Sequence, residues 1–432
     1  MIRSRLIAFE SSTLQTIDSS KLIDHTALSR AAVSVVERLS DNDYSAFIVG
    51  GAVRDLLLGK RPKDFDVATN ATPEQVVALF RGSRIIGRRF QIVHVRIGRE
   101  IIEVTTFRGH HDDGVPQTAV KSQKGLLLRD NVYGTLDQDA ARRDLTINAL
   151  YLDPVNKLIL DDLDGIEDIR QRLVRIIGNP ATRYSEDPVR MLRVVRFAAK
   201  LGFTIEETSQ VAISQCRHLL ADIPAARLFD ETLKLFMAGF AAPTIEHLAK
   251  YGLLEPLFPE AISAMNDPSS RSLVLKAMAN TDARIARGKP VTPAFLLGAL
   301  LWPAVAAKGS DIARAGAHEG SPINAAGQEV LMITLQRVSI PKRFSIPMRE
   351  IWELQPRLEK CASKRVKSIL SQRRFRAAFD LLLLRSESSD ELKSTVSFWE
   401  EQQQLFPDLV GSLPATEIPQ RKRRPRRRKR SQ

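Results

Sequence analysis

The chain has 432 residues, 44% of them hydrophobic, and a formal net charge of +14, which suits a globular protein of about two to four domains. No run of eighteen apolar residues occurs and no signal peptide is recognisable, so we expect no transmembrane segment. The two cysteines, Cys216 and Cys361, lack metal-ligand spacing, which favours ordinary thiols and a cytoplasmic protein.

The first elements alternate between helix and strand. Residues 1–29 have weak periodicity, and we predict a flexible N-terminal segment there. Helical spacing of apolar residues over 32–39 predicts a helix that leads into an apolar strand at Phe47–Val49. Further along, Ala71-Thr72-Pro73-Glu74 is typical of a helix start, with an N-cap threonine and a proline in the first turn, and the helix should end near Phe80.

Two strands are predicted next, at Ile92–Ile97 and Ile101–Phe107, because both segments alternate partly between apolar and polar residues. The polar segment 110–125 lacks periodicity and is predicted to be a mobile loop. The apolar run Leu145–Leu152 indicates a strand or the end of one. Residues 30–160 are therefore predicted to form an α+β head domain around one small mixed sheet.

Beyond residue 161 the pattern becomes helical, and no strand is predicted after residue 180. Prolines separate most of the helical blocks. We assign 161–240 to a helical neck and 241–410 to a helical body that extends a surface for a long ligand such as RNA. The clearest blocks are Pro188–Leu201, Arg227–Phe240, Pro243–Tyr251, Ala294–Leu301, Ala325–Val338 and Arg376–Arg385.

Positive charge is concentrated in the last segment, 411–432. Its final twelve residues, RKRRPRRRKRSQ, hold nine basic side chains and no acid, so the other 420 residues carry about +5. A block of like charge does not fold on itself, and we predict a disordered tail that contacts the phosphates of a polyanion. A role in solubility, nuclear localisation or membrane association is the alternative. The basic residues of the tail, which would be RNA-binding if the polyanion is RNA, are Arg421, Lys422, Arg423, Arg424, Arg426, Arg427, Arg428, Lys429 and Arg430.

The first chemical motif is a pair of carboxylates, Asp64 and Asp66, that follows the glycine pair Gly50-Gly51. In an extended strand, residues two apart point the same way, so both carboxylates would converge while Phe65 faces the core. Converging carboxylates suit Mg²⁺ bound together with substrate phosphates, and glycines let backbone N–H groups approach a phosphate. Either motif alone is usually a solvated turn, but their order indicates a triphosphate cradle beside a divalent-metal site.

Two further clusters carry charge. Glu103 sits between apolar neighbours on a predicted strand, where a carboxylate is unusual unless it faces a site; the solvent face of an edge strand is the alternative. The triplet Arg142-Arg143-Asp144 suits triphosphate and ribose contacts because guanidinium groups match phosphate oxygens. A surface cluster of salt bridges is the other interpretation of that triplet.

The segment Glu186–Arg190 is predicted to open a long helix. Asp187 and Arg190 lie three residues apart and would share a helix face, where an acceptor and a donor meet the edge of a nucleobase. Arg193 would lie on the same face and reach phosphate. The alternative is a helix start with internal salt bridges.

Together these motifs resemble the nucleotidyltransferases of the DNA-polymerase-beta superfamily, and most closely the class of CCA-adding enzymes and bacterial poly(A) polymerases. The resemblance lies in the glycine pair, the twelve-residue gap and the DxD motif, and in IEVTTFR, RRDLTIN and EDPVR. Within this class, Ile85–Val95 (IIGRRFQIVHV) is similar to a signature of the bacterial poly(A) polymerases. The similarity extends over about residues 30–400 and the basic tail.

The resemblance implies a polymerase-beta-like head followed by an all-α neck, body and tail. It implies a template-independent poly(A) polymerase that adds AMP from ATP to RNA 3′ ends and releases pyrophosphate, in RNA polyadenylation and turnover. Two Mg²⁺ ions, replaceable by Mn²⁺, would bind Asp64 and Asp66. The implied catalytic residues are Asp64, Asp66, Glu103 and Asp144, and the implied nucleotide-binding residues are Gly50, Gly51, Arg54, Arg143, Asp187, Arg190 and Arg193.

Two alternatives stay open at this point. A CCA-adding tRNA nucleotidyltransferase shares every catalytic motif, and only Ile85–Val95 and the helical remainder argue against it. A non-catalytic RNA-binding protein on the same scaffold is the second alternative, which the intact carboxylates argue against. Proteins of RNA degradation and RNA chaperones are partners that the resemblance leaves open.

Overall fold

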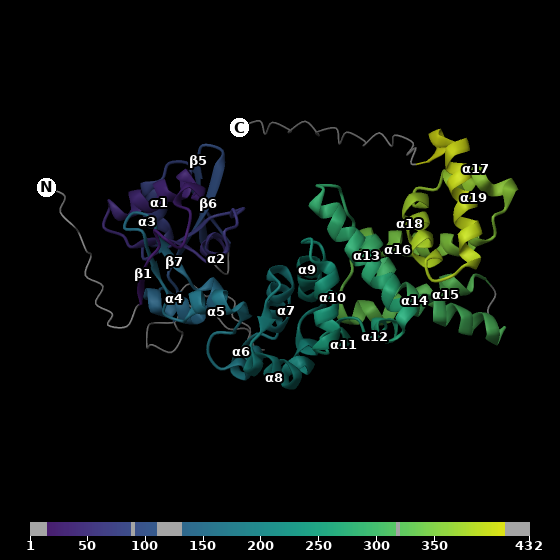
Figure 1. The fold of residues 1–432 in the computed structure, drawn as a ribbon, viewed down its shortest axis with the longest axis horizontal. Helices are drawn as coiled ribbons and strands as arrows, with labels where there is room; N and C mark the ends of the chain where they lie inside the picture. Colours follow the sequence, from purple (N-terminus) through teal and green to yellow (C-terminus); the bar gives the residue numbers. More distant parts are fainter. Residues whose placement is uncertain (1–14, 88–90, 110–131, 317–319, 411–432) are drawn as a thin grey trace, which may run out of the picture. The chain divides into compact units, whose positions relative to one another are not determined.

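The computed structural model describes residues 15–87, 91–109, 132–316 and 320–410, which form two compact units (Figure 1). The first unit runs to Ile223 and includes Lys250–Gly252, and the second contains the rest. The first unit contains both strands and helices, whereas the described residues of the second unit are helices and their connections. The predicted α+β class with a helical remainder is confirmed.

The first unit is built on an eight-stranded mixed sheet. Neighbouring strands are antiparallel except β3 and β6, which run parallel with Asp66 opposite Glu103. The strands, in their order across the sheet, are β1 (Thr16–Asp18), β8 (Leu158–Leu160), β7 (Tyr151–Asp153), β2 (Ala46–Val49), β3 (Asp66–Thr69), β6 (Glu100–Thr106), β5 (Ile92–Ile97) and β4 (Arg84–Ile86).

Local signals account for the first helices. Ser29 caps α1, which buries an apolar stripe that includes Val35 and Leu39. Thr72 and Gln75 form a reciprocal capping box at the start of α3, as the sequence predicted for Thr72. The helices of this unit are α1 (Arg30–Ser40), α2 (Gly51–Leu57), α3 (Pro73–Leu79), α4 (Leu136–Arg142), α5 (Gly165–Gln171), α6 (Pro180–Glu186), α7 (Val189–Leu201) and α8 (Glu207–Cys216).

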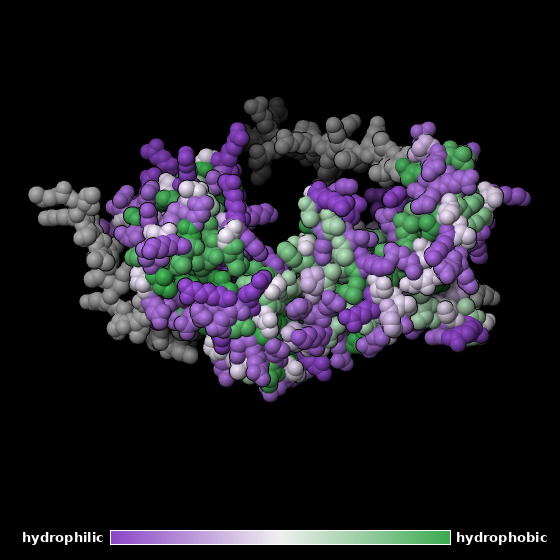
Figure 2. Space-filling model, in the orientation of Figure 1, coloured by the Kyte–Doolittle hydropathy of each residue, from purple (hydrophilic) through white to green (hydrophobic). Residues whose placement is uncertain are grey.

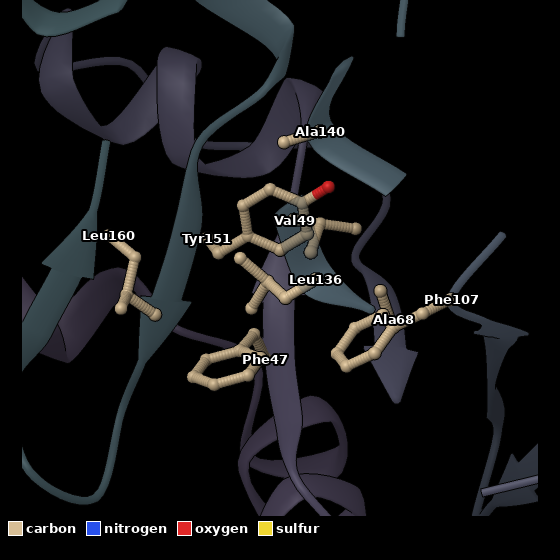
Figure 3. Packing of buried hydrophobic residues seen from close by; sticks show 8 residues of the cluster. All are labelled: Phe47, Val49, Ala68, Phe107, Leu136, Ala140, Tyr151 and Leu160. Atoms are coloured by element: carbon tan, nitrogen blue, oxygen red, sulfur yellow. The ribbon is translucent and has the colours of Figure 1, made fainter. Parts of the chain in front are cut away.

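A buried cluster beneath α4 fixes the central strands (Figure 3). Phe47 of β2 stacks on Phe107 and meets the edge of Tyr151, with both ring-centroid distances at 6.3 Å. The Tyr151 hydroxyl points out of the cluster on the side where Ala140 of α4 lies (Figure 3). The core of the sheet therefore places the Tyr151 hydroxyl near the end of α4, next to Arg143.

The structure corrects three predictions of secondary structure. β1 lies within the segment 1–29 that we predicted to be flexible, yet it pairs with β8 at the sheet edge. Within the run Leu145–Leu152, a 3₁₀ turn at Thr146–Asn148 precedes β7, so only its end is a strand. β10 (Thr204–Ile205) is a short strand after residue 180, paired in parallel with β9 (Leu173–Val174). Segments of two or three residues carry too little periodicity to be predicted.

The second unit packs its helices around buried aromatic side chains. The indole N–H of Trp352 donates to the carbonyl of Gly298 at 2.9 Å, and that of Trp399 donates to the carbonyl of Leu358 at 2.8 Å. Its helices are α9 (Ala225–Phe236), α10 (Ala241–Lys250), α11 (Leu254–Leu257), α12 (Ala261–Asn266), α13 (Pro268–Ala286), α14 (Pro293–Ala315), α15 (Pro322–Arg337), α16 (Lys342–Glu359), α17 (Val366–Leu370), α18 (Phe375–Ser386) and α19 (Glu391–Leu405).

One described helix, α14, is long and apolar enough to cross a membrane by length and composition. Half of its apolar window is buried inside the protein, and it packs against α13, α15 and α16. A core helix passes the same test, so α14 is weak evidence for a membrane span. The visible face of the molecule is mostly hydrophilic, with separate hydrophobic areas on each unit (Figure 2).

Candidate active site

The glycine pair links β2 to α2 and brings backbone close to an arginine. Gly50 has φ +68°, a conformation that side chains rarely adopt, and a Cβ there would lie 3.3 Å from Nη1 of Arg143. Arg54 of α2 is only 2% exposed. Its Nη1 donates to Oδ1 of Asn148 at 2.6 Å and its Nη2 donates to Asp55 at 2.7 Å. The turn therefore presents glycine backbone beside two fixed guanidinium groups.

The DxD carboxylates lie at the start of β3. Asp66 is the first residue of the strand, and Asp64 lies just before it. Both aspartates are exposed, while Phe65 between them is 8% exposed and packs inward, as the alternation predicted. Burial and the negative charges of Glu103 and Asp64 raise the pKa of Asp66 to about 6, against a smaller opposing effect of Arg143. The carboxylates thus repel one another.

Glu103 belongs to this group by strand pairing. It faces Asp66 across the parallel β3–β6 pair, and residues in register point to the same side of a sheet. On its other side, His94 of β5 places Nε2 3.3 Å from Oε1 of Glu103. The structure therefore brings Asp64, Asp66 and Glu103 together.

Arg143 is fixed by a buried carboxylate. Its Nη2 donates to Oδ2 of Asp139 at 3.0 Å and its Nε donates to the Tyr151 hydroxyl at 2.9 Å. That hydroxyl in turn donates to the same Asp139 oxygen at 2.6 Å. Asp139 lies one helical turn before Arg143, so α4 itself sets the geometry of the pair.

Asp144 lies in a different set of contacts from the DxD group. Its Oδ2 accepts from Arg193 at 2.5 Å, and its Oδ1 accepts from the backbone N–H of Leu145 at 2.9 Å. Burial opposes ionisation of Asp144, but Arg193 and these hydrogen bonds lower its pKa. The repulsion that acts on Asp66 comes from Glu103 and Asp64 and not from Asp144. Arg193, predicted to contact phosphate, is bonded to a carboxylate here.

The base-recognition pair has a geometry that differs from the predicted one. α6 ends at Glu186, Asp187 is extended with φ −149° and ψ 95°, and α7 begins at Val189. Pro188 disfavours helical backbone at the residue before it, which explains the break. The prediction that Asp187 and Arg190 share one helix is therefore wrong. Arg190 donates to Glu186 at 2.6 Å.

Three residues that support the site were not assigned a role from the sequence, although Asn148 and His94 lie within the quoted motifs RRDLTIN and IIGRRFQIVHV. Asn148 bridges Arg54 and Asp144, because its Oδ1 accepts from the first and its Nδ2 donates to the second at 3.4 Å. Asp139 could have been found from its spacing to Arg143 on a capped helix. The contact of His94 to Glu103 could not be predicted, because it depends on the pairing of β5 with β6.

Two predicted features lie in segments that the structure does not describe. The basic tail from Arg421 to Arg430 and the loop 110–125 lie outside the described residues. Within the described parts of the chain, no group of three or more His, Cys, Asp or Glu side chains is arranged to hold a metal ion. The DxD pair would thus need substrate phosphates to complete a metal shell.

Comparison with protein-family models gives three matches. The model of the poly A polymerase head domain matches residues 46–175. The model described as "Probable RNA and SrmB-binding site of polymerase A" matches 202–265, and that of the polymerase A arginine-rich C-terminus matches 315–432.

Individual relatives agree with these matches. The chain is 45% identical to Poly(A) polymerase I of Escherichia coli O6:H1 over 94% of this chain and 90% of that protein. It is 38% identical to the CCA-adding enzyme of Geobacillus stearothermophilus over 51% of this chain and 53% of that protein. The solved CCA-adding enzyme of Bacillus stearothermophilus in complex with CTP is 27% identical, with a TM-score of 0.57, over 87% of this chain and 82% of that one.

The mixed sheet, its carboxylates and the helical remainder define a nucleotidyltransferase of the class shared by CCA-adding enzymes and poly(A) polymerases. Similarity to the poly(A) polymerases extends over nearly the whole chain, whereas that to the curated CCA-adding enzyme covers about half of it. The chain belongs to the bacterial poly(A) polymerase family. The predicted family is confirmed, and the CCA-adding alternative is less well supported.

Proposed function

We propose that Asp64, Asp66 and Glu103 form the catalytic carboxylate group of this poly(A) polymerase. The observation that carries the proposal is their placement together, with Asp66 opposite Glu103 in the β3–β6 pair, where burial and repulsion by Glu103 and Asp64 raise the pKa of Asp66 to about 6. The fold holds negative charges together without an ion pair for Asp64 or Asp66 in the described chain, and such a group attracts a cation.

The enzyme transfers AMP from ATP to RNA 3′ ends without a template. The RNA 3′-hydroxyl oxygen attacks the α-phosphorus of ATP, a new phosphodiester bond forms, the bond to the β-phosphate breaks, and pyrophosphate leaves with its electrons. Arg143 and the Gly50-Gly51 backbone are placed to hold phosphates, because Asp139 fixes the guanidinium beside the glycine turn. Arg54 orients that turn through Asn148.

Two exposed carboxylates two residues apart, with the pKa of Asp66 raised, suit Mg²⁺, with Mn²⁺ as a substitute. Two such ions on Asp64 and Asp66 would supply charge neutralisation at the phosphates and a more acidic 3′-hydroxyl. Glu103 would orient this group from the neighbouring strand. Asp144 would act indirectly, by holding Arg193 and Asn148 in place.

Adenine selection is proposed for Asp187 and Arg190. The break between α6 and α7 places Asp187 in extended backbone at the start of the helix that carries Arg190. An acceptor and a donor lie at this corner, although one helix face does not align them, and Glu186 holds the Arg190 guanidinium in place. Interaction with proteins of RNA degradation or RNA chaperones and a cytoplasmic location stay predictions.

The direct test is nucleotide addition by the full chain with Mg²⁺. An unstructured RNA and a tRNA lacking its CCA end are each supplied with single nucleoside triphosphates and with all four. We expect long tails from ATP alone on both RNAs, and no tail with Asp66→Asn. Addition of two C and one A on the tRNA alone, or full activity of a folded Asp66→Asn variant, would contradict the proposal.

A further inference from the structure

A basic stripe runs along α7. Arg193, Arg196 and Lys200 follow one another at intervals of three and four residues, so they lie on one face of the helix. The stripe spans roughly 10 Å, from the rise of 1.5 Å per residue. Phe197 interrupts it with an aromatic ring. α7 lies between the segments matched by the head-domain and RNA-binding models, 46–175 and 202–265.

Guanidinium groups from two helices gather around that ring. The Cζ atoms of Arg54 and Arg196 lie 5.2 Å and 5.1 Å from the centroid of Phe197, and that of Arg193 lies at 5.9 Å. A phenyl face attracts cations but carries no net charge that could neutralise them. The ring therefore collects positive charge beside α2 and α7.

Two exposed lysines lie near these guanidinium groups. Lys60 and Lys200 are exposed, and neither has an ion pair within the described chain. Burial lowers the pKa of Lys200, and so do the charges of Arg54, Arg196 and Lys60, while Asp55 opposes them. Asp55 itself is bonded to Arg54. Lys60 and Lys200 therefore supply the positive charge at this place that no ion pair of the described chain balances.

We propose that Lys60, Arg196 and Lys200, the α2–α7 basic cluster, bind consecutive backbone phosphates of the RNA strand near its 3′ end. The inference rests on the proposed function, because it assigns the approach path of that RNA. A single strand presents a phosphate every few ångströms along its length, which suits Arg196 and Lys200, about 6 Å apart along the axis of α7. Phosphate contacts carry no base information, in keeping with a polymerase that extends without a template.

ATP is the competing source of phosphate, and geometry favours RNA. The Gly50 turn and Arg143 lie together beside the carboxylates, whereas Lys200 lies two helical turns beyond Arg193 on α7. A triphosphate held at the glycine turn would leave Lys200 without a ligand. The next phosphates of the RNA strand would fill that position.

The test uses the full chain with the double substitution Lys60→Ala/Lys200→Ala. Binding of a labelled oligoadenylate is measured as a function of salt, and KM is measured separately for RNA and for ATP. Loss of two contacts should reduce the slope of log K against log salt by about 1.4, from 0.7 per phosphate of a single strand. KM for RNA should rise severalfold, while kcat and KM for ATP stay unchanged.

The control is Lys21→Ala/Arg170→Ala, which removes two exposed charges from the same unit and should leave the slope unchanged. A slope equal to the parent's, or a rise in KM for ATP alone, would overturn the assignment to RNA. The proposed function fails separately, if folded Asp66→Asn protein stays active. The single variant Lys200→Arg should bind RNA as tightly as the parent, because the positive charge is retained.

Discussion

Replacing Asp66 with asparagine should abolish nucleotide addition and, in the absence of metal, stabilise the folded protein. Asparagine is close in shape to a protonated aspartate, so it removes a negative charge that Glu103 and Asp64 repel. Activity should fall about a thousandfold, because a metal-bound group at a transferring phosphate supplies several kcal/mol and 1.36 kcal/mol is tenfold in rate. A loss of activity with a gain of stability is hard to obtain from mere misfolding.

The size of the stability gain follows from the pKa. A rise of the Asp66 pKa from 3.8 to about 6 corresponds to about 3 kcal/mol at 1.36 kcal/mol per unit. Asp66 is more than a third exposed, so solvent screening reduces this to about 1 kcal/mol. In a domain of this size, that shifts the melting temperature by about 2–4 °C.

The pH dependence has a definite sign. The folded-state pKa of Asp66 is raised, so its protonated form favours folding below 3.8, and that contribution is lost as pH rises to about 6. The asparagine side chain of the variant does not titrate. The stability difference between variant and parent should therefore be absent below pH 3.8, widen as the pH rises to about 6, and stay constant above it.

The assay is thermal unfolding in EDTA across this pH range, followed by the same scan with Mg²⁺. Glu37→Gln is the matched control, since it removes one exposed negative charge from α1 in the same unit. Metal should stabilise the parent more than the variant. If Asp66→Asn is less stable than the parent in EDTA at about pH 8, well above the raised pKa, the reasoning about carboxylate repulsion is refuted.

Three further outcomes are expected. Asp139→Ala should lower the free energy of unfolding by about 3 kcal/mol in chemical denaturation, because it leaves the half-buried Arg143 without its carboxylate, and an unchanged midpoint would contradict this. Thr72→Ala should lower it by about 1 kcal/mol through loss of the α3 capping box, whereas Thr72→Ser should restore most of the loss. Deleting residues 421–432 should weaken RNA binding mainly at low salt, and a salt slope equal to that of the full chain would argue against the tail as an RNA contact.

The sequence predicted elements whose signal is local. Thr72, Pro73 and Gln75 lie within one turn, so the start of α3 could be placed to the residue. The predicted strand Ile92–Ile97 matches β5 because its alternation directly reflects one buried face. Phe65 was predicted to turn inward by the same argument, and it does.

The rest depends on contacts between distant residues. No local signal states that β3 pairs in parallel with β6, yet this pairing sets Asp66 opposite Glu103. The hydrogen bond from Arg193 to Asp144 joins residues 49 positions apart. The restriction that Pro188 imposes on Asp187 was local, but the helical pattern around it obscured the break.

The distribution of paired and unpaired charges in the first unit indicates where its ligands bind. Three arginines around the site each have a carboxylate partner: Arg143 has Asp139, Arg193 has Asp144 and Arg54 has Asp55. These pairs hold the site in shape before any ligand arrives.

Four other charged residues of the first unit have no ion pair within the described chain, two of them negative and two positive. Asp64 and Asp66 lack a cation, and Lys60 and Lys200 lack an anion, within the described chain. Bringing like charges together is unfavourable unless something bound to the protein neutralises them. A divalent cation would relieve the carboxylates, and the phosphates of an RNA strand would relieve the lysines. The cation would act where the RNA 3′-hydroxyl attacks the α-phosphate of ATP, and the basic cluster would hold the RNA strand that carries this hydroxyl.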